Sequence, residues 1–149
     1  MDILVIGGGG REHSLCWAIS KSPRCNRLYC TPGNAGISNI AECANIPDNN
    51  ITGIVDFAKK KNVDLVVIGP EGPLVLGLVD ALEAENIKTF GPSANAAQLE
   101  GSKAFMKQLF KKYNIPTAAF ECFNDFNRAV NYARKQTPPI VIKAVGLAA

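Results

Sequence analysis

The sequence predicts an α/β protein whose first part is a doubly wound, mainly parallel β-sheet. Short, continuous apolar runs at residues 3–6 and 64–68 are typical of strands that are buried on both faces of such a sheet. Glycine- and proline-rich turns follow these runs, and segments with helical spacing of apolar residues separate them. Strands that alternate with helices in this way indicate β-α-β units.

The expected elements of the first part follow one another in the order of such units. A strand is expected wherever a short apolar run ends in a turn: at residues 3–6, 27–30, 45–47 (a short edge segment), 64–68 and 88–90. A helix is expected wherever apolar residues recur at helical spacing: at residues 11–20, 51–61 and 74–85. We expect this first domain to close near residue 100.

Around and after residue 100, the expected helices and strands no longer alternate regularly. Helices are expected at residues 94–99, 103–113 and 125–135, the last with Asp125 as its N-cap. Strands are expected at residues 119–123 and 140–143. Two strands and a helix are too few for a sheet-based domain, so we interpret the second domain as unfinished. We expect fraying from about Thr137 onward, since the last strand lacks a complete sheet.

Composition and charge exclude several classes of function. The net charge of +3 comes from scattered basic residues, which argues against a nucleic-acid-binding surface. No apolar stretch reaches the ~18 residues that span a bilayer, and no basic leader precedes an apolar run, so we expect a cytoplasmic protein without a membrane segment. The cysteines are odd in number and include no C-x-x-C pair, which argues against a disulfide framework or a zinc site. We expect free thiols, several of them core residues: Cys16, Cys25, Cys30, Cys43 and Cys122.

Consecutive glycines at residues 7–10 lie between the first strand and the first helix and precede Arg11, Glu12 and His13. Glycine lets a backbone pass close to a ligand, a helix N-terminus favours an anion, and a guanidinium pairs with phosphate oxygens. The plain alternative is a tight turn before a solvated helical turn, in which the helix dipole favours Glu12. His13 is the only histidine, and a lone histidine is more often a structural group than a catalyst.

A dinucleotide-binding fingerprint is a further alternative for this glycine-rich turn. The third position of that fingerprint is a small residue, whereas this chain has Glu12 or His13 there, depending on the register. The second strand also ends without the acid that would hold an adenosine ribose. NAD binding is therefore poorly supported.

Two more turns follow strands that should lie beside the first strand. One turn contains Gly33 and Asn34, and the other contains Glu71, which can accept hydrogen bonds from ribose hydroxyls or an amine. Ligands of open α/β sheets bind at the carboxyl ends of the strands. Turn chemistry explains each turn alone, but three such turns on one edge favour a site for a polar ligand.

Several stretches of the sequence together carry a resemblance to a known family. They include residues 5–13 (VIGGGGREH), 32–36 (PGNAG), 67–71 (VIGPE), 96–103 (AAQLEGSK) and 140–144 (IVIKA). In order and spacing they resemble the phosphoribosylamine–glycine ligase family, also called glycinamide ribonucleotide synthetases, over all 149 residues.

The resemblance implies an ATP-dependent C–N ligase of the ATP-grasp superfamily that acts in de novo purine biosynthesis. Glycine, activated as an acyl phosphate, would be joined to 5-phosphoribosylamine while ATP is cleaved to ADP and phosphate. Residues 1–101 would form a pre-ATP-grasp, Rossmann-like substrate-binding domain, and residues 102–149 an incomplete ATP-grasp domain. Mg²⁺ would accompany ATP, with its ligands expected in a portion that the chain lacks.

The family's motifs also assign roles to residues of this chain by match. The substrate-binding residues would be Gly9, Gly10, Arg11, Glu12, His13, Gly33, Asn34 and Glu71. Lys103 and Lys143 would contact the ATP phosphates, a role that suits the compact charge of lysine. No catalytic residue and no metal ligand is expected within this chain.

The chain departs from the family pattern in two ways. Val145 stands where the family has an acid, and the apolar tail at residues 145–149 ends before the family's Gly-Lys-Gly loop. We therefore expect a truncated ligase that folds its first domain and lacks turnover by itself. The alternatives are a stand-alone phosphoribosyl-binding module without catalysis and, less well supported, a nucleotide-dependent oxidoreductase domain.

Overall fold

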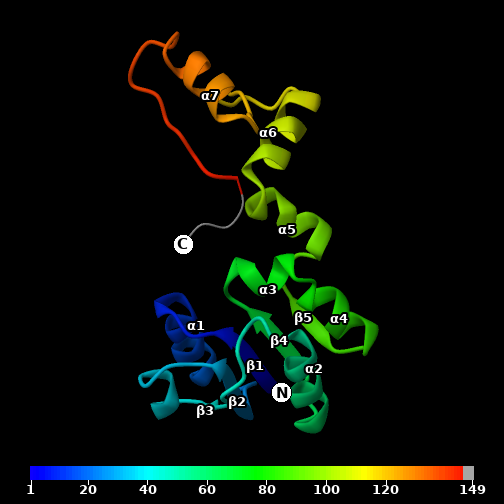
Figure 1. The fold of residues 1–149 in the computed structure, drawn as a ribbon. Helices are drawn as coiled ribbons and strands as arrows, with labels where there is room; N and C mark the ends of the chain where they lie inside the picture. Colours follow the sequence, from blue (N-terminus) through cyan, green and yellow to red (C-terminus); the bar gives the residue numbers. More distant parts are fainter. Residues whose placement is uncertain (146–149) are drawn as a thin grey trace. The chain divides into compact units, whose positions relative to one another are not determined.

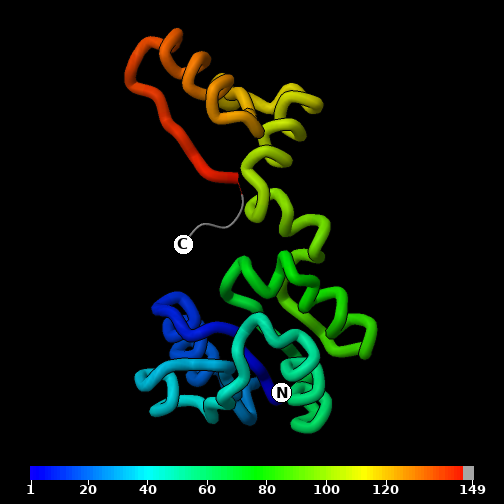
Figure 2. The backbone as a smooth tube through the Cα atoms, viewed as in Figure 1, coloured from blue at the N-terminus to red at the C-terminus, as the bar shows by residue number. Residues whose placement is uncertain are grey.

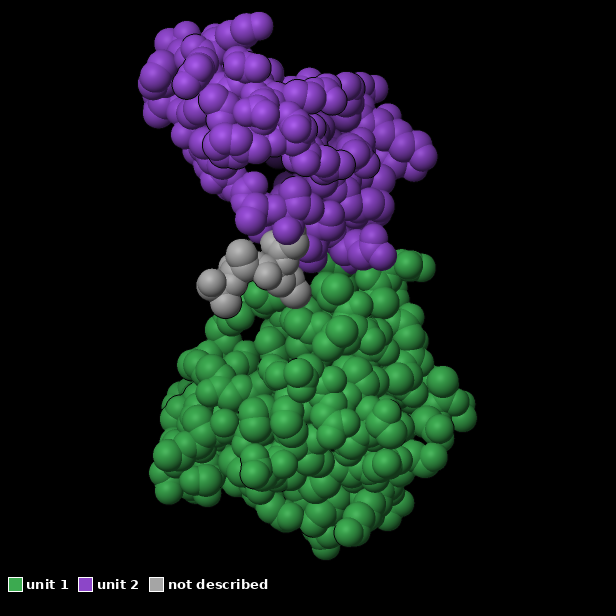
Figure 3. Space-filling view, in the orientation of Figure 1, with its two compact units in different colours: residues 1–97 green, residues 98–149 purple. Residues whose placement is uncertain are grey.

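The structure is a computed structural model that describes residues 1–145. The last part of the apolar tail, residues 146–149, lies outside the described residues. The chain forms two compact units, residues 1–97 and residues 98–149 (Figure 3). The division falls within helix α5 (Ala94–Gly101).

The first unit is built on a five-stranded parallel sheet, which confirms the fold class predicted from the sequence (Figure 1). Its strands are β1 (Asp2–Gly7), β2 (Arg27–Pro32), β3 (Glu42–Cys43), β4 (Leu65–Ile68) and β5 (Lys88–Phe90). They lie in the order β3-β2-β1-β4-β5. The chain thus builds outward from β1 to one side and then returns to build on the other. This reversal places a topological switch point beside β1, where ligands of such sheets bind.

Helices cover both faces of the sheet, and this explains the continuous apolar run of β1. Leu4 and Ile6 point into a core that includes residues of α2 (Ile51–Lys60) and α4 (Leu78–Ala84). Ile3 and Val5 point to the opposite face, where the core includes Cys16 of α1 (Gly10–Ser20). Successive strand residues face opposite sides, so a strand covered on both faces must be apolar throughout.

Two expected elements of the first unit differ from the structure. The helix expected at residues 74–85 is divided into α3 (Glu71–Val75) and α4. Gly77 divides it because its φ of +85° is left-handed, a conformation that ends a helix and that glycine adopts without strain. The prediction of an edge strand at residues 45–47 is wrong, since the edge strand β3 lies at Glu42–Cys43 instead. The carbonyls of Ala44 and Ile46 accept the Thr31 hydroxyl rather than joining a strand ladder.

The second unit contains the expected helices but not the expected strands. The helices include α6 (Lys103–Lys112) and α7 (Phe126–Ala133). Asp125 Oδ1 accepts the Arg128 N–H at 2.8 Å, which confirms the predicted N-cap. Within the described residues no strand forms at 119–123 or 140–143 (Figure 1). The red part of the backbone follows an extended path without helical coils (Figure 2). A strand needs a paired neighbour, and the side chains of residues 140–143 stay exposed instead, Ile142 at 83%. The fraying expected beyond Thr137 stays a prediction.

The burial of the cysteines and the length of the helices can be compared with the expectations of core thiols and of no membrane segment. Cys16 and Cys30 are buried, as expected for core thiols, whereas Cys43 and Cys122 are exposed. Among the residues that the structure describes, no helix is long and apolar enough to cross a membrane.

The packing of α4 against the sheet gives a test of the first core. Leu82 is 0% exposed in that core, whereas Leu76, just before α4, is 56% exposed. We expect Leu82→Ala to lower the free energy of unfolding by about 2–5 kcal/mol, because it leaves a cavity. Leu76→Ala removes the same atoms from a solvated site and should change it by less than about 0.5 kcal/mol. Urea denaturation followed by circular dichroism measures both, and equal effects would contradict this assignment of the core.

Candidate functional site

The turns after β1, β2 and β4 meet at one edge of the sheet and are joined by hydrogen bonds. The Gly33 N–H donates to the Gly7 carbonyl at 3.2 Å. The Gly69 N–H donates to the carbonyl of Ile6, the residue before Gly7, at 3.1 Å. The end of β1 therefore holds both neighbouring turns through its own backbone, and the three turns predicted from the sequence do come together.

The side chain of Asn34 ties the second turn to the first. Its Nδ2 donates to the Gly8 carbonyl at 2.9 Å. Its Oδ1 accepts the N–H groups of Gly36 and Ile37 at 2.8 and 2.9 Å, at the start of a short 3-10 helix, η1 (Ile37–Asn39). Both ends of the amide are therefore occupied, and the side chain fixes the shape of the loop.

Glu12 lies beneath the glycine turn rather than in solvent. It is 4% exposed, so the interpretation of residues 11–13 as a solvated helical turn is wrong for this side chain. Its Oε2 accepts the Gly9 N–H at 2.7 Å, which caps the N-terminus of α1. Gly9 has no side chain to return the bond, so only half of a capping box exists. Among the described residues, Oε1 of this carboxylate is buried without a hydrogen-bond partner.

Two glycines make room for the Glu12 side chain. A Cβ atom at Gly7 or at Gly69 would lie 2.6 Å from Glu12 Cγ, which is closer than carbon atoms approach. Gly7 also has a φ of +119°, which side chains rarely adopt. The sequence placed Gly69 in one of the candidate turns but did not assign it a role of its own. A contact with a side chain so far away in the chain gave no signal in the sequence, and turn chemistry explained the glycine equally well.

Arg11 and Glu71 are the exposed charges of the site. Arg11 Nη2 lies 3.6 Å from Glu71 Oε2, and the two side chains are 75% and 37% exposed. An ion pair this open to water is weak, so a ligand can displace it at little cost. Arg11 also belongs to the first turn of α1, whose N–H groups have no partner within the helix and carry the positive end of its dipole. The arrangement suits an anion beside a group rich in hydroxyls.

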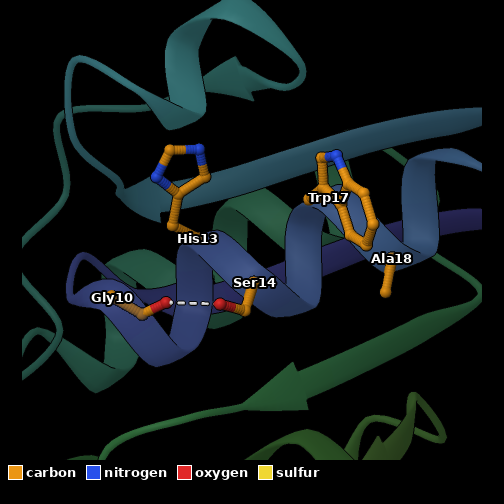
Figure 4. A pocket seen from close by; sticks show the side chains of 5 residues that line it. All are labelled: Gly10, His13, Ser14, Trp17 and Ala18. Atoms are coloured by element: carbon orange, nitrogen blue, oxygen red, sulfur yellow. Dashed lines mark hydrogen bonds between the residues drawn. The ribbon is translucent and has the colours of Figure 1, made fainter.

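His13 lies on the outer side of α1. It packs against Gly36, where a Cβ atom would lie 2.9 Å from His13 Nδ1. With Gly10, Ser14, Trp17 and Ala18 it lines a shallow hollow of about 430 Å³ (Figure 4). Among these residues, the Ser14 hydroxyl donates to the Gly10 carbonyl at 3.0 Å (Figure 4).

The geometry argues against a dinucleotide site. Glu12 occupies the third position of the fingerprint, and its buried carboxylate would face the pyrophosphate. At the end of β2, where an acid would hold the ribose, Thr31 instead directs its hydroxyl hydrogen toward the carbonyls of Ala44 and Ile46, at 3.0 and 2.7 Å.

Both predicted ATP-binding lysines belong to the second unit. Lys103 is the first residue of α6, directly after Ser102, whose hydroxyl accepts the Phe105 N–H at 3.2 Å and caps the helix. Lys143 lies in an exposed segment outside any helix or strand. Within residues 1–145, no group of three or more His, Cys, Asp or Glu side chains could hold a metal ion.

Comparisons with known proteins identify the relatives of this chain. Residues 1–100 match the family model of the phosphoribosylglycinamide synthetase N domain, and residues 101–149 match the model of its ATP-grasp (A) domain. Phosphoribosylamine–glycine ligases of Brucella melitensis and Rhizobium meliloti are each 53% identical over all 149 residues, which are 35% of either relative. The crystal structure of a phosphoribosylamine–glycine ligase from Thermotoga maritima has a TM-score of 0.75 at 30% identity, covering 99% of this chain and 34% of that one. The chain thus spans about a third of the length of these relatives.

The packing of Glu12 against Gly69 gives a test of the site's framework. We expect Gly69→Ala to lower the free energy of unfolding by about 1–3 kcal/mol, because its Cβ overlaps the buried Glu12 side chain. Glu12→Ala in the same chain should remove the overlap, so the double variant should lose less than the sum of the single variants. The matched control is Gly72→Ala, since no atom lies within 4 Å of a Cβ there. Additive losses in urea denaturation would contradict the contact.

Proposed function

This chain belongs to the phosphoribosylglycinamide synthetase family, and from that premise we propose that it is part of an enzyme that ligates glycine to 5-phosphoribosylamine. ATP is cleaved to ADP and phosphate, and glycinamide ribonucleotide is formed in de novo purine biosynthesis. The first unit holds the phosphoribosyl substrate. The observation that carries this proposal is the meeting of three turns at one sheet edge, with Arg11 and Glu71 3.6 Å apart and open to solvent.

The chemistry of each group suggests its role in substrate binding. The start of α1 and the guanidinium of Arg11 receive the phosphate, since both favour an anion. Glu71 accepts hydrogen bonds from the ribose hydroxyls or the amine. Gly9, Gly10 and Gly33 let the backbone approach the substrate, and Asn34 holds the loops in place through its bond to the Gly8 carbonyl. His13 borders the site, and the buried Glu12 supports it from beneath, since its Oε2 accepts the Gly9 N–H.

The second unit contributes to ATP binding in this proposal. Lys103 and Lys143 contact the ATP phosphates, and Mg²⁺ supplies charge neutralisation when bound. Residues 1–145 contain no group of carboxylates suited to Mg²⁺, so we assign its ligands to the part of the relatives that this chain does not match. The proposed partners are small molecules, namely 5-phosphoribosylamine, glycine and ATP. We propose no nucleic-acid or membrane partner, and the proposed location is the cytoplasm.

A stand-alone phosphoribosyl-binding module is the second candidate function. One observation favours it: all eight proposed substrate-binding residues belong to the first unit, residues 1–97. That unit has its own core on each face of its sheet. Substrate binding by this unit can therefore be tested apart from ligation. Product formation from 5-phosphoribosylamine, glycine and ATP by this chain would exclude the module. Binding without product is expected both of the module and of a part of the ligase that spans about a third of its relatives' length.

Calorimetry with glycinamide ribonucleotide tests substrate binding by this chain. We expect Arg11→Ala to raise the dissociation constant about tenfold or more, because charge-assisted hydrogen bonds to the phosphate are lost. Arg11→Lys should restore part of the affinity, since it keeps the charge but not the paired geometry.

The matched control for this experiment is Arg24→Ala. Arg24 is also exposed, but it lies far from the candidate site. Its carbonyl accepts a hydrogen bond from the amino group of Met1, at the end of β1 opposite to the glycine turn. The affinity should not change in this variant. If the unaltered chain shows neither binding heat nor a thermal shift, the proposal for the first unit fails.

A further inference from the structure

Three cysteines from three elements lie beside the candidate site. They are Cys16 of α1, Cys30 of β2 and Cys43 of β3. Cys16 and Cys30 are fully buried, whereas Cys43 is exposed on the short edge strand. None of the proposed binding or ligation steps uses these thiols.

Cys30 and Cys43 are neighbours across the sheet. They are register partners in the parallel pair of β2 and β3, so their side chains leave the same face. Neighbouring strands lie about 4.8 Å apart, within the range of about 4.4–6.8 Å between the Cα atoms of disulfide-bonded residues. Gly33 gives an independent measure: a Cβ atom there would lie 2.6 Å from Cys43 Sγ and 3.7 Å from Cys30 Cβ.

The Cys30 thiol also holds part of the candidate site together. Its Sγ donates to the Gly7 carbonyl at 3.3 Å. The same carbonyl accepts the Gly33 N–H at 3.2 Å. The thiol hydrogen therefore helps to hold the end of β1 against β2, at the same carbonyl that holds the turn after β2. A sulfur that is bonded to another sulfur has no hydrogen to donate.

We propose that Cys43 and Cys30 form an oxidation site for hydroperoxides, in which an intramolecular disulfide releases the Gly7 carbonyl and loosens the two turns. The Cys43 thiolate attacks one oxygen of the hydroperoxide, the O–O bond breaks, and hydroxide or alkoxide leaves. Cys43 is thereby oxidised by two electrons to a sulfenic acid. The Cys30 sulfur then displaces that hydroxyl group, which leaves as water with the Cys30 proton. One S–S bond forms, and the hydroperoxide is reduced.

The surroundings of the thiols fit this order of events. Of the three thiols beside the candidate site, only Cys43 is open to a peroxide in solvent. Burial raises the pKa of Cys43, and a hydrogen bond from the Asn34 backbone opposes this, so the thiolate is a minor species at neutral pH and the reaction is slow. The neighbouring Cys16 thiol, together with burial, raises the pKa of Cys30. Cys30 therefore remains a thiol that donates to Gly7 until Cys43 is oxidised.

Peptide mapping under non-reducing conditions tests the site. The reduced chain is treated with excess hydrogen peroxide and digested, and we expect a Cys30–Cys43 linkage that dithiothreitol reverses. Cys43→Ser should abolish the linkage. Cys122→Ser, which removes the other exposed thiol, should leave it unchanged. A linkage of Cys16 to Cys30, a linkage between chains, or overoxidised Cys43 without a linkage would overturn the proposal.

Amide hydrogen exchange measures the effect on the two turns. We expect the Gly33 N–H to exchange about tenfold faster in the oxidised chain, the factor that corresponds to one weakened hydrogen bond. Cys43→Ser treated with peroxide should keep the slow rate. Unchanged exchange in a chain with the disulfide would overturn the proposed loosening. Neither readout uses a substrate, so a failure here is distinct from a failure of the proposed function.

Discussion

The buried carboxylate of Glu12 is the interaction on which the candidate site depends. It accepts the Gly9 N–H at 2.7 Å and so fixes where α1 begins relative to the end of β1. A carboxylate at the third residue of a helix is favoured by the helix dipole, but its burial requires space that only residues without side chains provide. Gly7 provides it at the end of β1, and Gly69 in the turn directly after the neighbouring strand β4. The glycines therefore serve the protein's own side chain as much as a ligand.

This packing gives the site a buried, hydrogen-bonded base and leaves its charged groups exposed. The backbone of β1 holds the turns on both sides, through bonds to Gly7 and Ile6. Arg11 and Glu71 project from this base into solvent, where their weak ion pair is easily exchanged for contacts with a ligand. A preorganised framework with a few adaptable charges is what a site for a small phosphorylated molecule requires, because little entropy is lost on binding.

Structural features that depend on a few neighbouring residues could be predicted from the sequence. Features that depend on contacts between distant residues could not. The apolar run of β1 and the N-cap at Asp125 depend on their immediate neighbours, and both were predicted correctly. The pairing of Glu12 with Gly69 joins residues far apart in the chain, so the sequence showed only a turn and a charged helical start. The break at Gly77 was missed because a single glycine within an apolar helical pattern costs only about 1 kcal/mol relative to alanine, which packing can offset.

The second unit shows the same distinction for β structure. Ser102 and Asp125 cap their helices from within three residues, and these helices form without help from a sheet. Residues 140–143 have the composition of a strand, but a strand is defined by hydrogen bonds to a neighbouring strand. Within the described part of the chain, residues 140–143 have no such neighbour. The exposed apolar side chains of Val141 and Ile142 are the consequence. In the first unit, by contrast, every strand of the sheet has its partner within residues 1–97. The first unit is therefore the part of this chain whose binding chemistry can be examined without the rest of the relatives' length.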